Sequence, residues 1–192
     1  MRIIRYPHPT LRHVSKPLKR IDAELHAIVR RMFELMYEHK GVGLAANQVD
    51  LPYRLFVVNL KGKLGEGEEL VFVNPVLTRP RGLAEAEEGC LSLPELYGQV
   101  KRAEKITLDA FNLHGQAVHH ELDGLFARVV QHETDHIDGK LFIDRLSTTG
   151  ELEAREALRI FERDFALGRE RGEIPSDAEI AARLSEMEKL RT

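Results

Sequence analysis

The feature that most constrains this chain is an H-E-x-x-H run at residues 132–136, in a stretch that the apolar spacing predicts to be a helix. Residues four apart on a helix lie one above the other, about 5–6 Å apart, so His132 and His136 can bind one metal ion. Glu133 lies off that stripe and is poorly placed as a third ligand. It can reach a water on the metal, however, which is where a general base belongs. The run therefore predicts a helix that carries a catalytic metal.

The residues before the run favour a metal site over a chance pairing of two histidines. Leu125 and Val129 precede the histidines at helical spacing, so the apolar face of the predicted helix continues into both imidazoles. The two rings are therefore expected in the interior. Neutral imidazoles buried side by side need polar partners, and a metal ion supplies them.

Composition and charge argue against several other classes of protein. The 192 residues suffice for one domain with a full core, or for one domain with an appendage. A net charge of −3 leaves no basic excess, so we expect no sequence-specific nucleic-acid binding. No apolar run approaches the ~20 residues that span a membrane, and the N-terminus lacks the long apolar region of a signal peptide. We therefore expect a cytoplasmic protein with no membrane partner.

Periodicity and capping residues predict the main elements. An apolar stripe indicates an N-terminal helix that Asp22 caps and Gly41 ends, and Asp123 and Gly139 bound the metal-motif helix in the same way. Runs of Val, Ile, Leu and Phe predict four strands, at residues 54–60, 70–78, 105–113 and 116–122. The predicted fold class is α+β: antiparallel strands around a central metal-binding helix, with an N-terminal helix and a helical C-terminal tail.

The tail differs in character from the rest of the chain. A capping box of Thr148 with Glu151 predicts the start of one charged helix, and a second box of Ser176 with Glu179 predicts another. We expect Gly168 to be among the residues that break the first of these helices. Neither helix carries a motif with recognisable chemistry.

The chain is accordingly predicted to divide into two parts. Residues 1–146 would form the catalytic domain. Residues 147–192 would form a charged helical C-terminal extension, packed on the domain or on a partner.

A catalytic metal commonly takes three protein ligands and a water, so two histidines leave the site one ligand short. Cys90, the single cysteine, is one candidate, because a thiolate with two histidines is an accepted ligand set. Glu156 is another, since some H-E-x-x-H proteases take a glutamate from a later helix. The remaining candidates are remote histidines without motif spacing: His8, His13, His26, His39, His114, His119 and His120. The residues alone leave these alternatives open.

The segment from Gly41 to Gln48 superficially fits the G-x-G-x-x-A dinucleotide fingerprint. That fingerprint needs a strand before it and a helix after it, and here the order is reversed, so a nucleotide site is rejected. Its two glycines allow the backbone to approach a substrate closely. Taken by itself, the segment is best interpreted as a helix end and a turn, with Gln48 exposed.

Three segments in order carry a specific resemblance. Gly41–Gln48, Glu88–Ser92 and Gln131–Gly139 closely resemble the three signature motifs of bacterial peptide deformylases. The resemblance extends to about Leu146 and does not obviously cover the tail. It implies a metal-dependent hydrolase that removes the N-formyl group from the N-terminal formyl-methionine of newly made polypeptides and releases formate.

The resemblance also implies a ligand set and a metal. Cys90, His132 and His136 would bind the metal, and Glu133 would be the general base. Fe²⁺ is the usual ion of the family, and Zn²⁺, Ni²⁺ or Co²⁺ can take its place, since nitrogen and sulfur ligands suit several ions. A thiolate beside ferrous iron is open to oxidation, so activity is expected to fade in air.

Two groups are implied as donors to the oxyanion that forms during hydrolysis. These are the Gln48 side chain and the backbone N–H of Leu91, next to the ligand cysteine. The backbone around Gly43 would pair with the extended substrate as an added strand.

An apolar pocket for the methionine side chain is implied beside the metal. Val42, Leu125 and Val129 are the candidates for its wall. Arg128 stands where an apolar residue is expected, although its stem could pack while the guanidinium reaches water. Tyr97 stands where a bacterial relative carries an arginine for the substrate backbone.

Two other classes of function compete with this one. A metalloprotease or aminopeptidase would use the same helix and, in one version, Glu156 as ligand. A structural zinc module would close its site with four protein ligands, which leaves Glu133 without a purpose. The deformylase interpretation expects formyl-methionyl nascent chains as partners, and a ribosome contact through the tail, as a C-terminal helix makes in some relatives.

Overall fold

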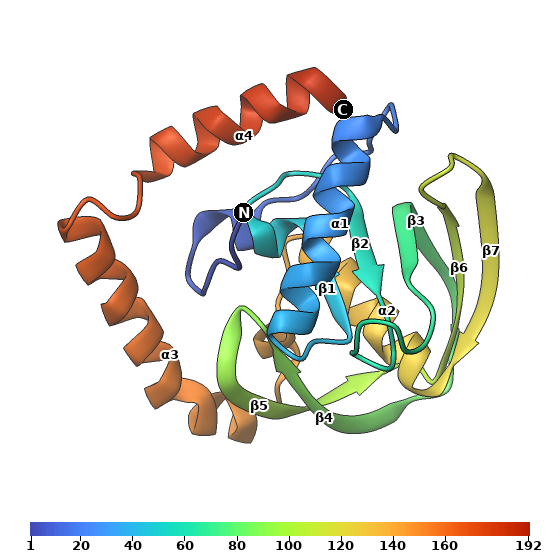
Figure 1. Ribbon diagram of the computed structural model, residues 1–192. Helices are drawn as coiled ribbons and strands as arrows, with labels where there is room; N and C mark the ends of the chain where they lie inside the picture. The colour runs from blue at the N-terminus through green and yellow to red at the C-terminus, as the bar shows by residue number, and fades with distance from the viewer.

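A five-stranded antiparallel sheet forms the centre of the protein in a computed structural model that describes residues 1–192 (Figure 1). Its strand order is β1-β2-β3-β6-β7. The strands are β1 (Gly43–Ala45), β2 (Leu55–Val58), β3 (Leu70–Arg81), β6 (Lys105–Phe111) and β7 (Ala117–Asp123). The four strands expected from apolar runs are confirmed as β2, β3, β6 and β7, with shifts of a few residues at their ends. The predicted α+β class is also confirmed.

The middle of the sheet, at β1, β2 and the start of β3, is covered on both faces. α1 (Ala23–Glu38) covers one face and α2 (Gly124–Ile137) covers the other. All four residues of β2 are fully buried, and their side chains alternate between the faces. Leu55 and Val57 belong to the core that includes α1, whereas Phe56 and Val58 belong to the core that includes α2. β2 therefore contributes equally to the two cores.

Local signals set the ends of α1. The Asp22 side chain accepts a hydrogen bond from the Leu25 N–H at 2.9 Å, as a helix N-cap does. At the other end, Gly41 donates to Met36 across the last turn, which is a Schellman arrangement. Its left-handed position is occupied by Lys40, with φ of 57°, and not by Gly41 as the sequence suggested.

A two-stranded hairpin was not foreseen from the sequence. β4 (Ala84–Cys90) pairs with β5 (Leu93–Arg102), and a register shift lies between Gly89 and Cys90. β4 is built mainly from Ala and Glu, and β5 contains Pro94, so neither strand has the β-branched composition that identifies strands in sequence. The hairpin belongs to a third core with the N-terminal segment, Phe142 and α3.

Short 3-10 helices link these elements. They are η1 (Pro9–Arg12), η2 (Ala46–Val49) and η3 (Phe142–Arg145). η2 directly follows β1, and η3 directly precedes the tail. Together with the strands, they hold the functional segments of the chain against α2.

The tail forms two helices, α3 (Thr148–Glu170) and α4 (Asp177–Arg191). The cap of α3 is one residue earlier than expected: Ser147 accepts from the Gly150 N–H, so the predicted Thr148 box is wrong. Gly168 does not break α3 either, because it lies inside the helix, where Ile174 packs closely over it. The Ser176 box at the start of α4 is confirmed.

α4 returns to the body of the protein. Figure 1 shows the C-terminus beside the start of α1. The Arg191 side chain is 2% exposed and contacts both Asp22 and Glu24, while Glu188 accepts from His13 and Lys16. The tail therefore packs on the N-terminal part of the chain. No helix of the protein has the length and apolarity needed to cross a membrane.

Gly139 ends α2 at a position where an added side chain would lower stability in two ways, by backbone strain and by a steric clash. Its φ of 72° is strained for alanine, and a Cβ would lie 2.6 Å from the Arg12 carbonyl oxygen. Gly172 has a similar φ of 71° but open space around it. We expect Gly172→Ala to lower the free energy of unfolding by about 1–2 kcal/mol. Gly139→Ala should lower it by a further ~1–3 kcal/mol from overpacking.

Urea unfolding of the two variants beside the unmodified protein checks this expectation. Equal losses in the two variants would mean that the close approach of Arg12 contributes nothing, and that backbone strain alone matters.

Candidate active site

The structure brings together one sulfur and two imidazoles from distant parts of the chain. Cys90 lies at the end of β4, and His132 and His136 lie one turn apart on α2. One potential ligand atom from each of the three lies within 4.8 Å of the others. Cys90 Sγ is 3.3 Å from His136 Nε2, and the two imidazole centroids are 5.0 Å apart. Hairpin and helix thus converge on one point.

The other sources considered for a third ligand lie elsewhere. Glu156 is on α3 with 79% of its side chain exposed, where it faces Arg159. The cluster of Cys90 with the two histidines is the only such group in the protein that could hold a metal, so no remote histidine joins it.

The residues present fit a transition metal. One thiolate and two imidazoles suit such an ion and leave a coordination position for water. Glu133, the neighbour of His132, is 4% exposed, and its Oε2 has no hydrogen-bond partner in the protein. An unpaired buried carboxylate oxygen is costly unless a ligand or water satisfies it. Burial raises the pKa of Glu133 to about 7.

Gly43 makes room for the Glu133 carboxylate. A Cβ on Gly43 would collide with Oε1 of Glu133, so the absence of a side chain on β1 lets the glutamate lie directly against the strand. The glycine that the sequence assigned to close substrate approach therefore also accommodates the candidate base.

The two histidines differ in their surroundings. Burial lowers the pKa of His136 well below its usual value, so this imidazole is neutral and able to act as a ligand. Burial would also lower the pKa of His132, but hydrogen bonds to Cys90 and Glu88 together raise it to about 10.

Gln48 is buried, not exposed as the segment alone suggested. Only 1% of Gln48 is accessible. Its Oε1 accepts from the Ala45 N–H at 2.9 Å, which fixes the amide so that Nε2 points at Cys90 Sγ, 3.4 Å away, and at Ser92 Oγ, 3.3 Å away. The isolated segment gave the wrong prediction because these contacts come from the β4–β5 turn, more than 40 residues further along the chain.

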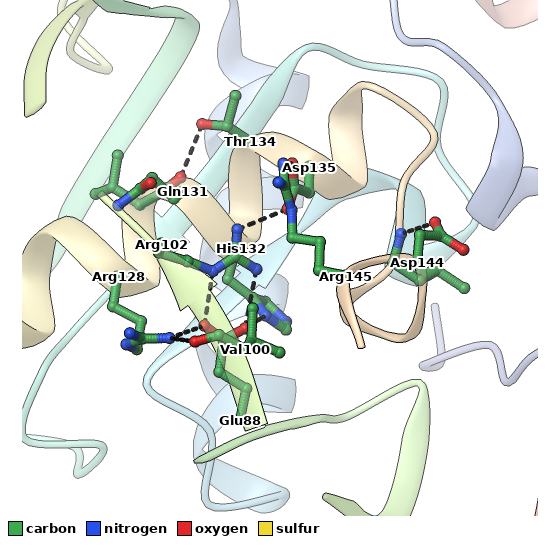
Figure 2. A network of polar contacts seen from close by, with 12 residues as sticks. Glu88, Val100, Arg102, Arg128, Gln131, His132, Thr134, Asp135, Asp144 and Arg145 are labelled. Carbon is green, nitrogen blue, oxygen red and sulfur yellow. Dashed lines mark hydrogen bonds and ion pairs between the residues drawn. The ribbon is translucent and has the colours of Figure 1, made fainter. Parts of the chain in front are cut away.

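Glu88 supports the first histidine of the motif (Figure 2). Its Oε2 accepts from His132 Nδ1 at 3.0 Å, and Arg102 binds both carboxylate oxygens. Burial alone would raise the pKa of Glu88, but the hydrogen bonds from His132 and Arg102 together lower it to about 2. Glu88 is therefore an anion that holds the imidazole ring in one orientation.

A second buried ion pair continues this network along α2. Arg102 also donates to Asp135 at 2.7 Å, and Arg145 donates to the same carboxylate at 2.6 Å. No role for Glu88, Arg102 or Asp135 was expected from the sequence. Glu88 lies two residues before Cys90 on β4, where residues two apart face the same side, so its place beside the cysteine follows only once the hairpin is known.

The ligand cluster opens into a cavity of about 580 Å³. Its lining includes all four residues expected to bind substrate: Val42, Gly43, Leu125 and Val129. Leu125 is 58% exposed, so the expectation that it lies on the buried stripe is wrong; it is in the first turn of α2, at the mouth of the cavity. A larger cavity of about 960 Å³ between α1 and the sheet contains none of the three ligand residues.

Comparison with known proteins identifies the family. A profile of the polypeptide deformylase family matches residues 1–151. The chain belongs to this family. The curated peptide deformylase of Rhodopirellula baltica is 50% identical over 190 residues, which is 99% of this chain and 94% of that protein.

Solved deformylase structures share the fold. A crystal structure of Arabidopsis thaliana peptide deformylase 1B in complex with an inhibitor has 38% identity and a TM-score of 0.84, and the match covers 92% of this chain and 97% of that one. The peptide deformylase of Legionella pneumophila has 41% identity and a TM-score of 0.78, with 86% and 96% covered.

Peptide deformylases are metal-dependent hydrolases that remove the N-formyl group from newly made polypeptides. Membership in the family decides against the two alternatives that the sequence left open, which were a peptide-bond protease and a structural zinc module. The candidate Cys–His–His metal site agrees with a metal-dependent deformylase.

A paired substitution tests which residue completes the ligand set. We expect Cys90→Ser to lose most of its bound metal, because a serine hydroxyl is a far poorer donor than a thiolate. Glu156→Ala should keep about one metal per chain, because its carboxylate is far from the cluster. Metal analysis of both purified proteins measures this, and the reverse pattern would remove Cys90 from the site.

Proposed function

We propose that this deformylase hydrolyses the formamide of N-terminal formyl-methionine in the cavity beside Cys90, His132 and His136. The observation that carries the proposal is the convergence of these three ligand groups next to the unpaired carboxylate oxygen of Glu133. A divalent ion held by the three side chains would supply a Lewis acid and lower the pKa of water towards ~7.

Glu133 is the proposed general base. Its free Oε2 takes a proton from the attacking water and then delivers it to the departing amine. Two features suit it to both steps: burial removes competing solvent, and a pKa raised to about 7 allows it to accept and to return a proton near neutrality. The contact with Gly43 keeps the carboxylate against β1.

Gln48 and Leu91 are the proposed donors to the oxyanion that forms on the formyl oxygen. The Gln48 amide is held by Ala45 with its N–H groups towards Cys90. The Leu91 N–H, directly after Cys90, donates to no other group in the protein. Two fixed donors beside the ligand cluster would supply the hydrogen bonds that an oxyanion requires.

The substrate would bind as an extended strand. β1 is the first strand of the sheet, so one of its edges lacks a partner strand, and Gly43 lies on it. Pairing through the backbone tolerates varied downstream residues. Val42, Leu125 and Val129 would surround the methionine side chain, and the exposure of Leu125 at the cavity mouth agrees with a surface that the ligand covers.

We propose Fe²⁺ as the native ion, with Zn²⁺, Ni²⁺ or Co²⁺ as substitutes. The donor set of one sulfur and two imidazole nitrogens supports any of these ions, and the choice of iron follows from the resemblance to the family.

Residues 1–146 would form the catalytic unit, and residues 147–192 an extension that packs on it. A cytoplasmic location and a contact of the extension with the ribosome are part of the proposal. Support for the contact comes from α3, where the exposed Arg155, Arg159 and Arg163 recur every four residues; Arg159 and Arg163 also pair with Glu156 and Asp164.

Substitution of the proposed base gives the most direct test. We expect Glu133→Ala to bind metal as the unmodified enzyme does, and to release formate from formyl-Met-Ala about 10²–10⁴-fold more slowly, the usual contribution of a positioned acid–base group. Formate release and metal content are measured on the same preparation. Loss of metal together with activity would assign Glu133 a structural role, and absence of formate from the unmodified enzyme would reject the function.

Removal of the side-chain donor tests the oxyanion assignment. Gln48→Leu keeps a similar volume in a buried position, and it should raise the barrier by about 2.7–4 kcal/mol, the effect of removing one such donor. Steady-state kinetics with formyl-Met-Ala should then show a large fall in kcat with little change in KM. A rise in KM alone would make Gln48 a substrate-binding residue.

A further inference from the structure

Arg128 lies on α2 one turn before His132 and lines the substrate cavity. Its guanidinium is directed at Glu88 (Figure 2), and only 12% of the side chain is exposed. Nη1 donates to Glu88 Oε1 at 2.6 Å and to the Val100 carbonyl at 3.0 Å, and Nη2 donates to the Ala84 carbonyl at 2.8 Å. One side chain on α2 thus contacts both strands of the β4–β5 hairpin.

The Glu88 carboxylate is held from two sides. Its Oε2 accepts from His132 Nδ1 at 3.0 Å and from Arg102 Nη2 at 2.9 Å. Its Oε1 accepts from Arg102 Nε and from Arg128 Nη1, each at 2.6 Å. Arg102 is shared with Asp135, so Arg128 is the only arginine that serves Glu88 and no other carboxylate. Without Arg128, Oε1 of Glu88 would lose one of its two donors.

Arg128 contributes to the cavity and also to the polar network around Glu88. Arg128 lines the cavity together with Leu125 and Val129 of the same helix, and its three methylenes give it an apolar stem that suits an apolar ligand. The charge is balanced by Glu88 and hydrogen-bonded to two carbonyls. An arginine therefore occupies an apolar wall without presenting an uncompensated charge to the ligand.

We propose that Arg128 is a positioning residue that links the side-chain pocket to the metal ligands. Its head group fixes Glu88 and, through Glu88, the orientation of the His132 ring. Its stem forms part of the wall against which the methionine side chain packs. The inference rests on the ligand set given under the proposed function.

Two substitutions separate the tasks of stem and head group. Arg128→Met keeps an unbranched apolar stem and removes the head group, whereas Arg128→Ala removes both. Partners of histidine ligands typically contribute about 10–100-fold to metal affinity, so both variants should bind Co²⁺ more weakly by that factor in a chelator competition. Arg128→Lys, which restores one charged donor, should bind Co²⁺ with intermediate affinity.

Substrate binding provides the second measurement, at saturating Co²⁺. Arg128→Ala should raise KM for formyl-Met-Ala about tenfold, because the methionine loses contact with the stem. Arg128→Met should leave KM close to that of the unmodified enzyme.

Arg54→Met is the matched control. Arg54 is 17% exposed and also joins a carboxylate of the α2 end, Asp138, and a strand carbonyl, Pro75, but it contacts neither Glu88 nor the cavity. It should lose thermal stability without a change in Co²⁺ affinity.

The proposal is overturned if Arg128→Met binds Co²⁺ as tightly as the unmodified enzyme, or if Arg54→Met loses the same affinity. An unchanged KM in Arg128→Ala would reject the pocket role of the stem. If Cys90→Ser binds Co²⁺ as well as the unmodified enzyme does, the ligand set itself is wrong, which is a separate and recognisable failure.

Discussion

The structure depends on the burial of polar side chains along the second half of α2. Every residue from His132 to Ile137 is buried, and four of the six are ionisable. Such burial is costly unless each charge finds a partner with good geometry. Glu88, from the hairpin, serves His132, while Arg102 and Arg145 serve Asp135. The hairpin is therefore as necessary to α2 as α2 is to the candidate site, because it brings both Cys90 and the counter-charges of Glu88 and Arg102.

The sequence predicted the features of the fold that depend on interactions between residues close together in the chain. The Asp22 cap, the Gly139 end of α2 and the apolar strands of the sheet were confirmed, because capping and periodicity act over a few residues. The β4–β5 hairpin was missed, since its strands are stabilised by partners and not by their own composition. Gln48 was wrongly expected to be exposed for a related reason: its burial depends on Cys90 and Ser92.

The candidate site shows the same contrast between features set by nearby residues and features set by tertiary contacts. The two histidines and the glutamate follow from one helical spacing, and the geometry around them agrees with it. Cys90 could be favoured by ligand chemistry and by resemblance, but its approach to the histidines is a tertiary contact. The direction of Arg128 was open for the same reason, because a side chain that spans from a pocket wall to a buried carboxylate is defined only when the strand carrying that carboxylate is in place.

The contact between Gly43 and Glu133 has a consequence for how the enzyme would select the N-terminal residue of its substrate. The strand proposed to pair with the substrate backbone is the same strand against which the candidate base rests. A ligand that slipped by one residue would move its reactive carbon by ~3.3 Å and turn its first side chain to the opposite face. The hydrogen-bond register along β1 would then determine which amide carbon lies beside Glu133. Internal amides would be out of line with the base, and so would not be hydrolysed, even where their side chains fit the pocket.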